Sequence, residues 1–408
     1  MKSWLPIPDN SDFSVHNLPY GIFHTGDGRA RAGVAIGDHI LDLEAAANAG
    51  LFGKRRFYSK IFAQDTLNDF IALGKPVTKG IRKKLQAWLT QEQKPDGADA
   101  LLTNRDKATM QMPVRVGNYT DFYSSIEHAT NVGKMFRPDG DALLPNWRWL
   151  PVGYHGRASS IVISGTPIKR PHGQILPKGE TKPVFSPSKQ LDFELEIAFV
   201  VGKNSALGEP ITVDKAEEYI FGLLLFNDWS ARDIQRWEYV PLGPFLGKNF
   251  GSSVSPWIVP MEALEPFRVK GPKQDPAPLD YLKQKGSKNY DIELEVGIKP
   301  LNSTETIVSR SNFKYLYWSM VQQLTHHTVN GCNVCVGDIM ASGTISGPTP
   351  DSYGSLLELS WAGTKPIHLQ DGSTRTFLLD GDTLTIRGWC SKDGVRVGFG
   401  EVRGGVKG

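Results

Sequence analysis

The most constraining feature of the sequence is a run of alternating apolar and acidic residues from Leu191 to Ile197. Side chains alternate between the two faces of a β-strand, so this run predicts a strand with one apolar and one acidic face. The acidic face would carry Asp192, Glu194 and Glu196. Glu194 and Glu196 would lie about 7 Å apart along the strand, within reach of one ion. Alternation alone is more often typical of a strand whose polar face meets solvent.

Two further carboxylates favour ion binding over a solvent-facing strand. The apolar run 221–226 predicts a buried strand, and Asp228 follows two positions later, where a carboxylate needs a partner. Asp121 lies among aromatic residues, just after an expected domain boundary. Asp121, Glu194, Glu196 and Asp228 would together form an all-oxygen site. Such a site suits Ca²⁺ or Mg²⁺ better than zinc.

A candidate general base, His128, stands seven positions after Asp121. A lone histidine is more often a structural residue with its hydrogen bonds satisfied. The functional alternative is a base that takes a proton from water beside the metal site. Its orienting carboxylate would be Glu358, which lies in the apolar segment 356–359. We expect that segment to be a strand, in which a lone carboxylate needs a partner.

A group of cationic and amide side chains follows Asp228, namely Arg232, Gln235, Arg236 and Lys248. These side chains are either surface charges or donors for a tetrahedral oxyanion. The sequence has no Gly-x-Ser-x-Gly nucleophile motif, and Gly343-Thr-Ile-Ser-Gly places its serine one position late. It also lacks a P-loop and a dinucleotide-binding glycine motif, so these chemistries are not supported.

Short strand-like runs separated by turn residues recur along the 408-residue chain, which contains 42 Gly and 27 Pro. We expect strands over 21–25, 32–36, 40–43, 161–163, 191–201, 219–226, 257–259, 292–298, 356–359 and 383–387, and helices over 67–73, 78–90, 215–219 and 311–325. Strands without alternating helices favour a mainly β, mixed or antiparallel architecture over a doubly wound α/β fold. The polar segment 91–108 indicates a boundary between a small domain, residues 1–112, and a large one, residues 113–408.

Charge and cysteine content limit the partners and the compartment. The net charge is only +3, which gives no support to a nucleic-acid partner or a polybasic membrane surface. No apolar run resembles a signal peptide or a membrane span. The three cysteines do not form a disulfide framework, so we expect a soluble cytoplasmic protein. Cys332 and Cys335 form a Cys-x-x-Cys pair in a turn before a strand, which favours bystander thiols over a redox or zinc site.

Several longer motifs resemble those of the fumarylacetoacetase family. They include Tyr119-Thr-Asp-Phe-Tyr-Ser-Ser, His128-Ala-Thr-Asn-Val-Gly, Leu191-Asp-Phe-Glu-Leu-Glu, Phe226-Asn-Asp-Trp-Ser-Ala-Arg-Asp-Ile-Gln and Ala341-Ser-Gly-Thr-Ile-Ser-Gly. The resemblance runs over nearly the whole chain, and the motifs occur in the family's order. It implies a small SH3-like N-terminal β-barrel followed by a large mixed β-sandwich roll that forms a homodimer. It also implies hydrolysis of 4-fumarylacetoacetate to fumarate and acetoacetate, the last step of tyrosine and phenylalanine catabolism.

The resemblance also implies roles for individual residues. Asp121, Glu194, Glu196 and Asp228 match calcium ligands, and His128 and Glu358 match the base and its orienter. Arg232, Gln235 and Lys248 match residues around the oxyanion and leaving group. Substrate contacts are implied for Tyr123, Arg137, Tyr154, Gln235, Tyr239 and Thr344. A second magnesium or sodium site is implied for Asp228, Lys248 and Ser252, although the family usually has Thr where Ser252 stands.

Two other functions remain open on the sequence alone. One is a related β-diketo-acid hydrolase or acylpyruvase with the same metal site and another acyl preference. The other is a non-catalytic Ca²⁺-binding β module, which would not need a paired His128 and Glu358.

Overall fold

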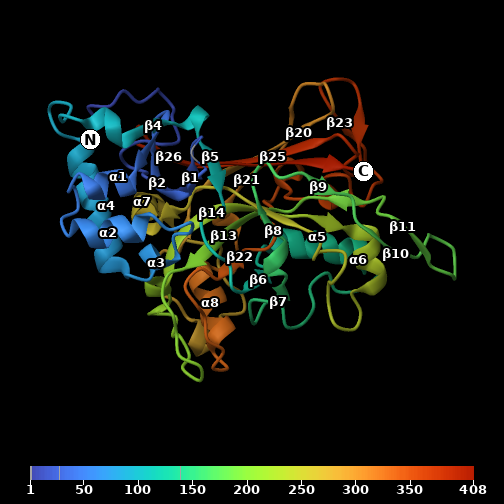
Figure 1. The fold of residues 1–408 in the computed structure, drawn as a ribbon. Helices are drawn as coiled ribbons and strands as arrows, with labels where there is room; N and C mark the ends of the chain where they lie inside the picture. The colour runs from blue at the N-terminus through green and yellow to red at the C-terminus, as the bar shows by residue number, and fades with distance from the viewer. Residues whose placement is uncertain (1, 27, 138) are drawn as a thin grey trace.

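The computed structural model describes residues 2–26, 28–137 and 139–408. Figure 1 shows the N-terminal part in blue at one end of the molecule, with long strands of the remaining chain extending away from it. The expected mainly β architecture, with a small N-terminal part and a larger remainder, is confirmed. Within the described residues, no helix is long and apolar enough to cross a bilayer.

The N-terminal part is built on a five-stranded antiparallel sheet with the strand order β4-β3-β2-β1-β5. Its strands are β1 (Tyr20–His24), β2 (Arg31–Ile36), β3 (His39–Asp42), β4 (Leu102–Asn104) and β5 (Thr109–Gln111). Between β3 and β4 lie α1 (Leu43–Asn48), α2 (Arg55–Phe62), α3 (Asn68–Ile71) and α4 (Lys75–Leu89). The expected helices over 67–73 and 78–90 correspond to α3 and α4, whereas α1 and α2 were not predicted. Helix α4 buries Ile81, Leu85 and Leu89, which share one face at a spacing of four residues.

The larger part is centred on a mixed sheet with the strand order β7-β6-β22-β13-β14-β16-β8, and β17 also pairs with β14. The β6–β22 and β16–β8 pairs are parallel, and the other pairs are antiparallel. The strands are β6 (Tyr119–Phe122), β7 (Gly153–Gly156), β8 (Ile161–Ile163), β13 (Leu195–Val201), β14 (Ile220–Asp228), β16 (Ser252–Val254), β17 (Val259–Pro260) and β22 (Ile339–Ala341).

A second sheet, ordered β21-β20-β25-β26-β9, packs against one face of the central sheet. Its strands are β9 (Ile168–Lys169), β20 (Glu293–Lys299), β21 (Thr306–Asn312), β25 (Thr383–Lys392) and β26 (Val395–Lys407). Ile197 and Phe199 on β13 share a core with Val296 on β20 and Ile386 on β25. The two sheets therefore form a sandwich around the largest apolar core.

The opposite face of the central sheet is covered by the N-terminal part. Ala198 and Val200 of β13 share a second core with Ile22 of β1. The central strands are thus buried on both faces, which explains why segment 221–226 is continuously apolar.

Backbone contacts join the two parts of the chain. The N–H and C=O groups of Tyr20 and Ile258 bond to each other at 3.0 and 2.8 Å. Near the C-terminus, Gly398 N donates to Asp12 O at 3.0 Å, and Arg396 Nε donates to Asp12 Oδ1 at 2.8 Å. A Cβ on Gly398 would lie 2.0 Å from Asp12 Cγ, so this close approach requires glycine.

The larger part also contains helices, some of which differ from the predictions. They are α5 (Ile126–Phe136), α6 (Arg232–Glu238), α7 (Met261–Leu264), α8 (Met320–Thr328) and α9 (Leu356–Leu359). Helices α5 and α6 were not predicted. The expected helix over 311–325 is wrong in its first half, because Ser311 and Asn312 end β21 and pair with β20. The expected helix over 215–219 is a short 3-10 helix, Ala216–Tyr219.

The prediction of a strand over 356–359 is wrong, because these residues form helix α9. Ser355 Oγ accepts a hydrogen bond from Glu358 N at 3.3 Å. Asp192 accepts from Leu356 N and Leu357 N at 2.7 and 2.9 Å. The N-cap Ser355 and the distant Asp192 thus satisfy N–H groups of the first turn, and a four-residue apolar segment has no period that predicts a helix.

Four small two-stranded ribbons complete the fold. They are β10 (His172–Ile175) with β11 (Val184–Pro187), β12 (Leu191–Asp192) with β15 (Ser230–Ala231), β18 (Arg268–Val269) with β19 (Asn289–Tyr290), and β23 (Ile367–His368) with β24 (Thr374–Arg375).

We predict that Leu224→Ala destabilises the protein by about 2–5 kcal/mol, because Leu224 is fully buried in the core between the central sheet and the N-terminal part. Denaturant unfolding of the variant and the parent would measure this difference. Leu207, which is 79% exposed, is the matched control, and Leu207→Ala should change stability by less than about 0.5 kcal/mol. Equal effects of the two substitutions would contradict the two-sided burial of β14.

Candidate active site

Four buried carboxylates converge on the central sheet. Asp121 lies on β6, Glu196 on β13 and Asp228 at the end of β14, while Glu194 lies in the break between β12 and β13. One oxygen of each lies within 4.8 Å of the others. These are the four residues that the sequence predicts as one site. Because they are buried, the solvent-facing interpretation of the alternating run is excluded.

Two buried cations lie against this carboxylate cluster. Lys248 Nζ donates to Glu194 Oε2 at 2.6 Å and to Asp228 Oδ2 at 2.8 Å. Arg232 Nη1 donates to Glu194 Oε1 at 2.7 Å. Burial alone would raise the pKa of Glu194, but Lys248 and Arg232 outweigh it and hold that pKa below its usual value. The negative charge of Glu194 is thus matched within the chain.

On the other side of the cluster, two carboxylate oxygens have no hydrogen-bond donor beside them among the described residues. Asp121 Oδ1 and Glu196 Oε1 are buried and have no hydrogen-bond partner in the described part of the chain. Burial, followed by repulsion from Asp228, raises the pKa of Asp121 well above its usual value. Burial, followed by repulsion from Asp121, does the same for the pKa of Glu196. Unpaired carboxylate oxygens facing one another are the donor set of a cation site, so the cluster can hold a metal ion.

The backbone supplies one donor to this cluster. Gly343 N donates to Glu196 Oε2 at 3.0 Å. Gly343 has a φ of +76°, and a Cβ there would lie 2.2 Å from Phe122 O. Only glycine fits this left-handed, crowded position, so the segment after β22 can approach the carboxylates.

A histidine–carboxylate pair lies near the cluster. His128 Nδ1 and Glu358 Oε2 are 2.7 Å apart, and both side chains are buried. The ring of Tyr123 packs edge-on against the imidazole, with 5.2 Å between ring centroids. The two residues are 230 positions apart in the sequence, and the fold pairs them as predicted.

Glu358 is held by three further hydrogen bonds that sequence reasoning missed. Asn131 Nδ2 donates to it at 2.9 Å, Ser346 Oγ at 2.8 Å and Ser355 Oγ at 2.9 Å. Burial raises the pKa of Glu358, but His128 and these donors hold it below its usual value. The carboxylate is therefore kept ionised beside the imidazole.

Helix α5 positions His128, and this helix was also missed. Ser125 is its N-cap, and Ser125 Oγ accepts from His128 N at 3.2 Å. Asn131 follows His128 by three positions, which places both side chains on one helix face towards Glu358. A serine three positions before His128 is the capping signal that could have predicted the helix.

Of the cationic and amide side chains after Asp228, some lie at the carboxylate cluster and one lies on the surface. Helix α6 presents Arg232 and Gln235 together, and Arg232 Nη1 lies 3.3 Å from Gln235 Oε1. Arg236 instead donates to Gln190 Oε1 at 2.8 Å on the exposed side. The surface-charge alternative thus holds for Arg236, whereas Arg232, Gln235 and Lys248 lie around the carboxylate cluster.

The expected substrate-contacting residues also divide. Tyr154 OH donates to Asp228 Oδ2 at 3.1 Å, and Thr344 Oγ1 is buried without a hydrogen-bond partner among the described residues. Arg137, at the end of α5, donates to the backbone oxygens of Asp141 and Ala142 at 3.3 and 2.8 Å. Tyr239, just after α6, is 44% exposed. Thr344 is therefore the buried member, and Tyr123 and Tyr154 are half-buried.

A cavity of about 260 Å³ leads to the carboxylate cluster. It is lined by Tyr154, Asp228, Lys248 and Ser252 together with residues of β7 and the loop after α6. Ser252 Oγ donates to Asp228 Oδ1 at 2.9 Å. The cavity thus reaches Asp228, one of the four carboxylates.

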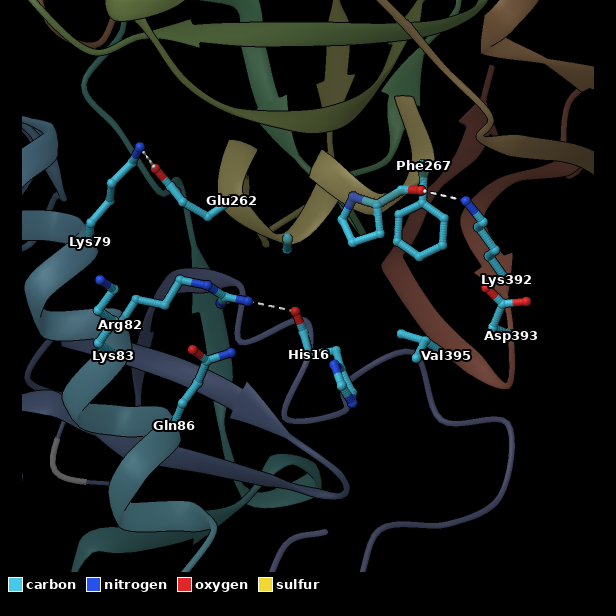
Figure 2. A pocket seen from close by; sticks show the side chains of 12 residues that line it. His16, Lys79, Arg82, Lys83, Gln86, Glu262, Phe267, Lys392, Asp393 and Val395 are labelled. Atoms are coloured by element: carbon cyan, nitrogen blue, oxygen red, sulfur yellow. Dashed lines mark hydrogen bonds and ion pairs between the residues drawn. The ribbon is translucent and has the colours of Figure 1, made fainter. Parts of the chain in front are cut away.

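A larger cavity, of about 600 Å³, lies elsewhere and shares no lining residue with the carboxylate cluster. Figure 2 shows α4 on one side of it and the segment 262–267 on the other. Lys79 pairs with Glu262 across it at 3.5 Å, and Lys392 Nζ donates to Pro266 O at 3.3 Å. Arg82 Nη2 donates to His16 O at 2.5 Å. Lys79, Lys392 and Arg82 thus already have protein partners. The cavity lies at the junction between the two parts of the chain, because both parts contribute residues to its lining.

Cys332 and Cys335 lie in the loop before β22 and are both free thiols. Burial and the nearby Asp338 raise the pKa of Cys335, which disfavours a reactive thiolate. Within residues 2–26, 28–137 and 139–408, the carboxylate cluster is the only group of three or more candidate metal ligands.

The sequence was compared with known families and proteins. Residues 16–113 match the family model "Fumarylacetoacetase N-terminal", and residues 118–407 match "Fumarylacetoacetate (FAA) hydrolase C-terminal". Fumarylacetoacetase of Homo sapiens is 55% identical, with 99% of this chain and 98% of the relative covered. Fumarylacetoacetase of Arabidopsis thaliana is 53% identical, covering 100% and 98% respectively. The solved fumarylacetoacetate hydrolase of Exiguobacterium antarcticum matches the fold with a TM-score of 0.54 at 20% identity, covering 96% of this chain and 99% of that one.

We predict that Cys332 and Cys335 are not needed for catalysis. A variant with both Cys332→Ser and Cys335→Ser should keep its kcat within about twofold, because neither thiol contacts the carboxylates or His128 in the described structure. Steady-state kinetics and elemental analysis of the purified protein would check this. Stoichiometric zinc in the parent, lost in the variant, would show the prediction to be wrong.

Proposed function

The chain belongs to the fumarylacetoacetase family, and from this premise we propose that its carboxylate cluster and its His128–Glu358 pair form one catalytic centre. The protein is a hydrolase that cleaves a carbon–carbon bond of 4-fumarylacetoacetate and yields fumarate and acetoacetate, a step of tyrosine catabolism. The observation that carries the proposed centre is the convergence of four carboxylate oxygens within 4.8 Å, beside a buried imidazole held at 2.7 Å from a carboxylate.

We propose that Asp121, Glu194, Glu196 and Asp228 hold Ca²⁺ or Mg²⁺. The donors are all carboxylate oxygens, which hard cations prefer, and the unpaired Asp121 Oδ1 and Glu196 Oε1 fit this role. A bound divalent cation would act as a Lewis acid that lowers the energy of the developing enolate charge.

His128 is the proposed general base. With its Nδ1–H donated to Glu358 Oε2, its Nε2 is left to accept a proton from water. Glu358 fixes the ring orientation and stabilises the imidazolium that forms. The three hydroxyl and amide donors on Glu358 hold that carboxylate in place during the proton transfer.

Arg232, Gln235 and Lys248 are the proposed partners of the oxyanion and leaving group. Arg232 Nη2 is buried and has no acceptor in the described part of the chain, so it is available for developing negative charge. Water attacks the ketone carbon, a new C–O bond forms and the alkoxide is stabilised by these donors. The carbon–carbon bond then breaks with its electron pair on the leaving enolate, which takes up the proton held by His128.

The remaining assignments concern substrate and a second cation. Arg137 with Tyr123 and Tyr154 would hold a substrate carboxylate by charge-assisted hydrogen bonds. The other proposed substrate contacts are Gln235, Tyr239 and Thr344. A second magnesium or sodium ion is proposed at Asp228, Lys248 and Ser252. Because the Lys248 ammonium carries a proton and donates to Asp228, Lys248 would contribute its backbone oxygen there rather than Nζ.

We further propose a homodimer that acts in the cytoplasm. Exposed apolar side chains gather in the loop after α6, where Val240, Leu242 and Phe245 meet solvent in a single chain. A second copy covering such a patch would remove it from water. The three cysteines are free thiols, as is usual in a reducing compartment.

We predict that turnover requires the divalent ion. Chelation should abolish activity, and added Ca²⁺ or Mg²⁺ should restore it, because the four carboxylates repel one another without a cation. Ion binding should also raise the unfolding temperature of chelator-treated protein, since a ligand of the folded state stabilises it. Glu196→Gln should weaken both effects. Full activity of exhaustively metal-free protein would contradict the metal assignment.

We predict that His128→Ala lowers kcat by about 10²–10⁴-fold while the protein still binds Ca²⁺. Glu358→Gln should lose less, because the amide oxygen can still accept a hydrogen bond from the ring. The two losses should be strongly non-additive, since the orienter has nothing to hold once the ring is gone.

The matched control for these variants is His24→Ala, on β1 of the N-terminal sheet, which should keep the parental kcat. The deciding measurement is kcat for both single variants, the double variant and the control, on protein of verified metal content. It would show whether His128 and Glu358 act as a pair. Independent multiplication of the two losses would refute the paired roles.

A further inference from the structure

Asp192 is the acidic residue of the alternating run that the proposed mechanism does not use. It is 0% exposed and lies on β12, two positions before Glu194, but it is not part of the carboxylate cluster. A fully buried carboxylate is costly unless donors surround it. The identity of its donors therefore indicates what this charge does.

Four hydrogen bonds end on the two oxygens of Asp192. Oδ1 accepts from Phe193 N at 2.8 Å and from Leu356 N at 2.7 Å. Oδ2 accepts from Leu357 N at 2.9 Å and from Arg232 Nε at 2.8 Å. One carboxylate thus joins the first turn of α9 to the guanidinium on α6.

The contact with Arg232 determines which donor faces the site. Nε is held by Asp192, and Nη1 is held by Glu194 and Gln235. Because the guanidinium is planar, these two anchors fix its orientation. The remaining nitrogen, Nη2, is the buried donor without a partner in the described residues.

The contact between Asp192 and α9 fixes the position of Glu358. Asp192 binds the N–H groups of the two residues directly before Glu358. Glu358 in turn holds His128 Nδ1. A shift of Asp192 would therefore move the oxyanion donor and the base-orienting carboxylate together.

We propose that Asp192 is a positioning residue that sets Arg232 and Glu358 relative to each other, so that the oxyanion donor and the water-activating base face the same substrate carbon. This inference rests on the roles proposed above for Arg232 and Glu358. An asparagine could not replace this carboxylate, because each oxygen accepts two N–H donors and either amide orientation would set an NH₂ group against two of them.

The test compares Asp192→Asn with Asp382→Asn. Asp382 is a matched control, because it is 1% exposed, accepts from Arg375 Nε and Nη2 at 2.8 Å and from Leu379 N at 2.8 Å, and contacts no proposed site residue. Both variants should lose stability in denaturant unfolding. Asp192→Asn should lower kcat by about 10²-fold with little change in KM, since misplacement affects the transition state, whereas Asp382→Asn should keep the parental kcat.

Metal binding is the second readout, because Asp192 is close to Glu194 in the sequence. Titration with Ca²⁺ should give similar affinity for Asp192→Asn and the parent, which separates misplacement of Arg232 from loss of the ion. A kcat loss explained by lost Ca²⁺ binding, or a kcat unchanged from the parent, would overturn the proposal.

Two Arg232 variants keep the test decisive even if Asp192→Asn does not fold. Arg232→Gln should lose about 10²–10³-fold in kcat, and full activity there would refute the role of Arg232 in the proposed mechanism. Arg232→Lys keeps the charge but lacks the Nε that Asp192 holds, so its kcat should fall nearly as far. If Arg232→Gln is impaired while Arg232→Lys keeps the parental kcat, orientation by Asp192 is not required and only the present inference fails.

Discussion

Mutual repulsion among four buried carboxylates is the constraint on which this structure depends. Asp121, Glu194, Glu196 and Asp228 could not remain together without opposite charge, and the chain supplies part of it through Lys248 and Arg232. The cations match one side of the cluster, and the other side keeps unpaired oxygens. This asymmetry distinguishes the cluster, which can hold a metal ion, from a closed network of ion pairs, in which every oxygen would be satisfied.

The rest of the fold makes this concentration of charge possible. Three of the carboxylates come from strands of the central sheet, and both faces of that sheet are covered. Rigid, paired strands fix the spacing of the acids more firmly than loops would. The proposed base His128 and its proposed orienter Glu358 lie instead on helices α5 and α9, whose first turns are capped by Ser125 and Ser355. The central sheet thus carries these three carboxylates, and the capped helices α5 and α9 carry His128 and Glu358.

The sequence was most informative where a pattern has a physical period. The alternation from Leu191 to Ile197 predicted the acidic face, and the apolar run before Asp228 predicted a buried strand. Helix α9 was missed because its four residues show no helical period, and because two N–H groups of its first turn donate to Asp192, more than 160 positions away. Among the donors to Glu358, Asn131 is 227 positions away and was missed for this reason, whereas Ser355 is only three positions away. The Ser125 cap of α5 and the Ser355 cap of α9 are local signals that were available in the sequence.

The contacts between Asp12 and the last strand have a consequence for synthesis on the ribosome. The N-terminal part emerges first, yet its partners Ile258, Arg396 and Gly398 emerge much later. During elongation the apolar face that later covers the central sheet has no native partner, and such surfaces favour association with other chains. Glu358 also emerges long after Asp121, so the nascent chain cannot form the proposed catalytic centre until both segments have been synthesised. A chain that lacks residues 397–408 would lose the hydrogen bonds between Gly398 and the N-terminal residues Asp12 and Asn17.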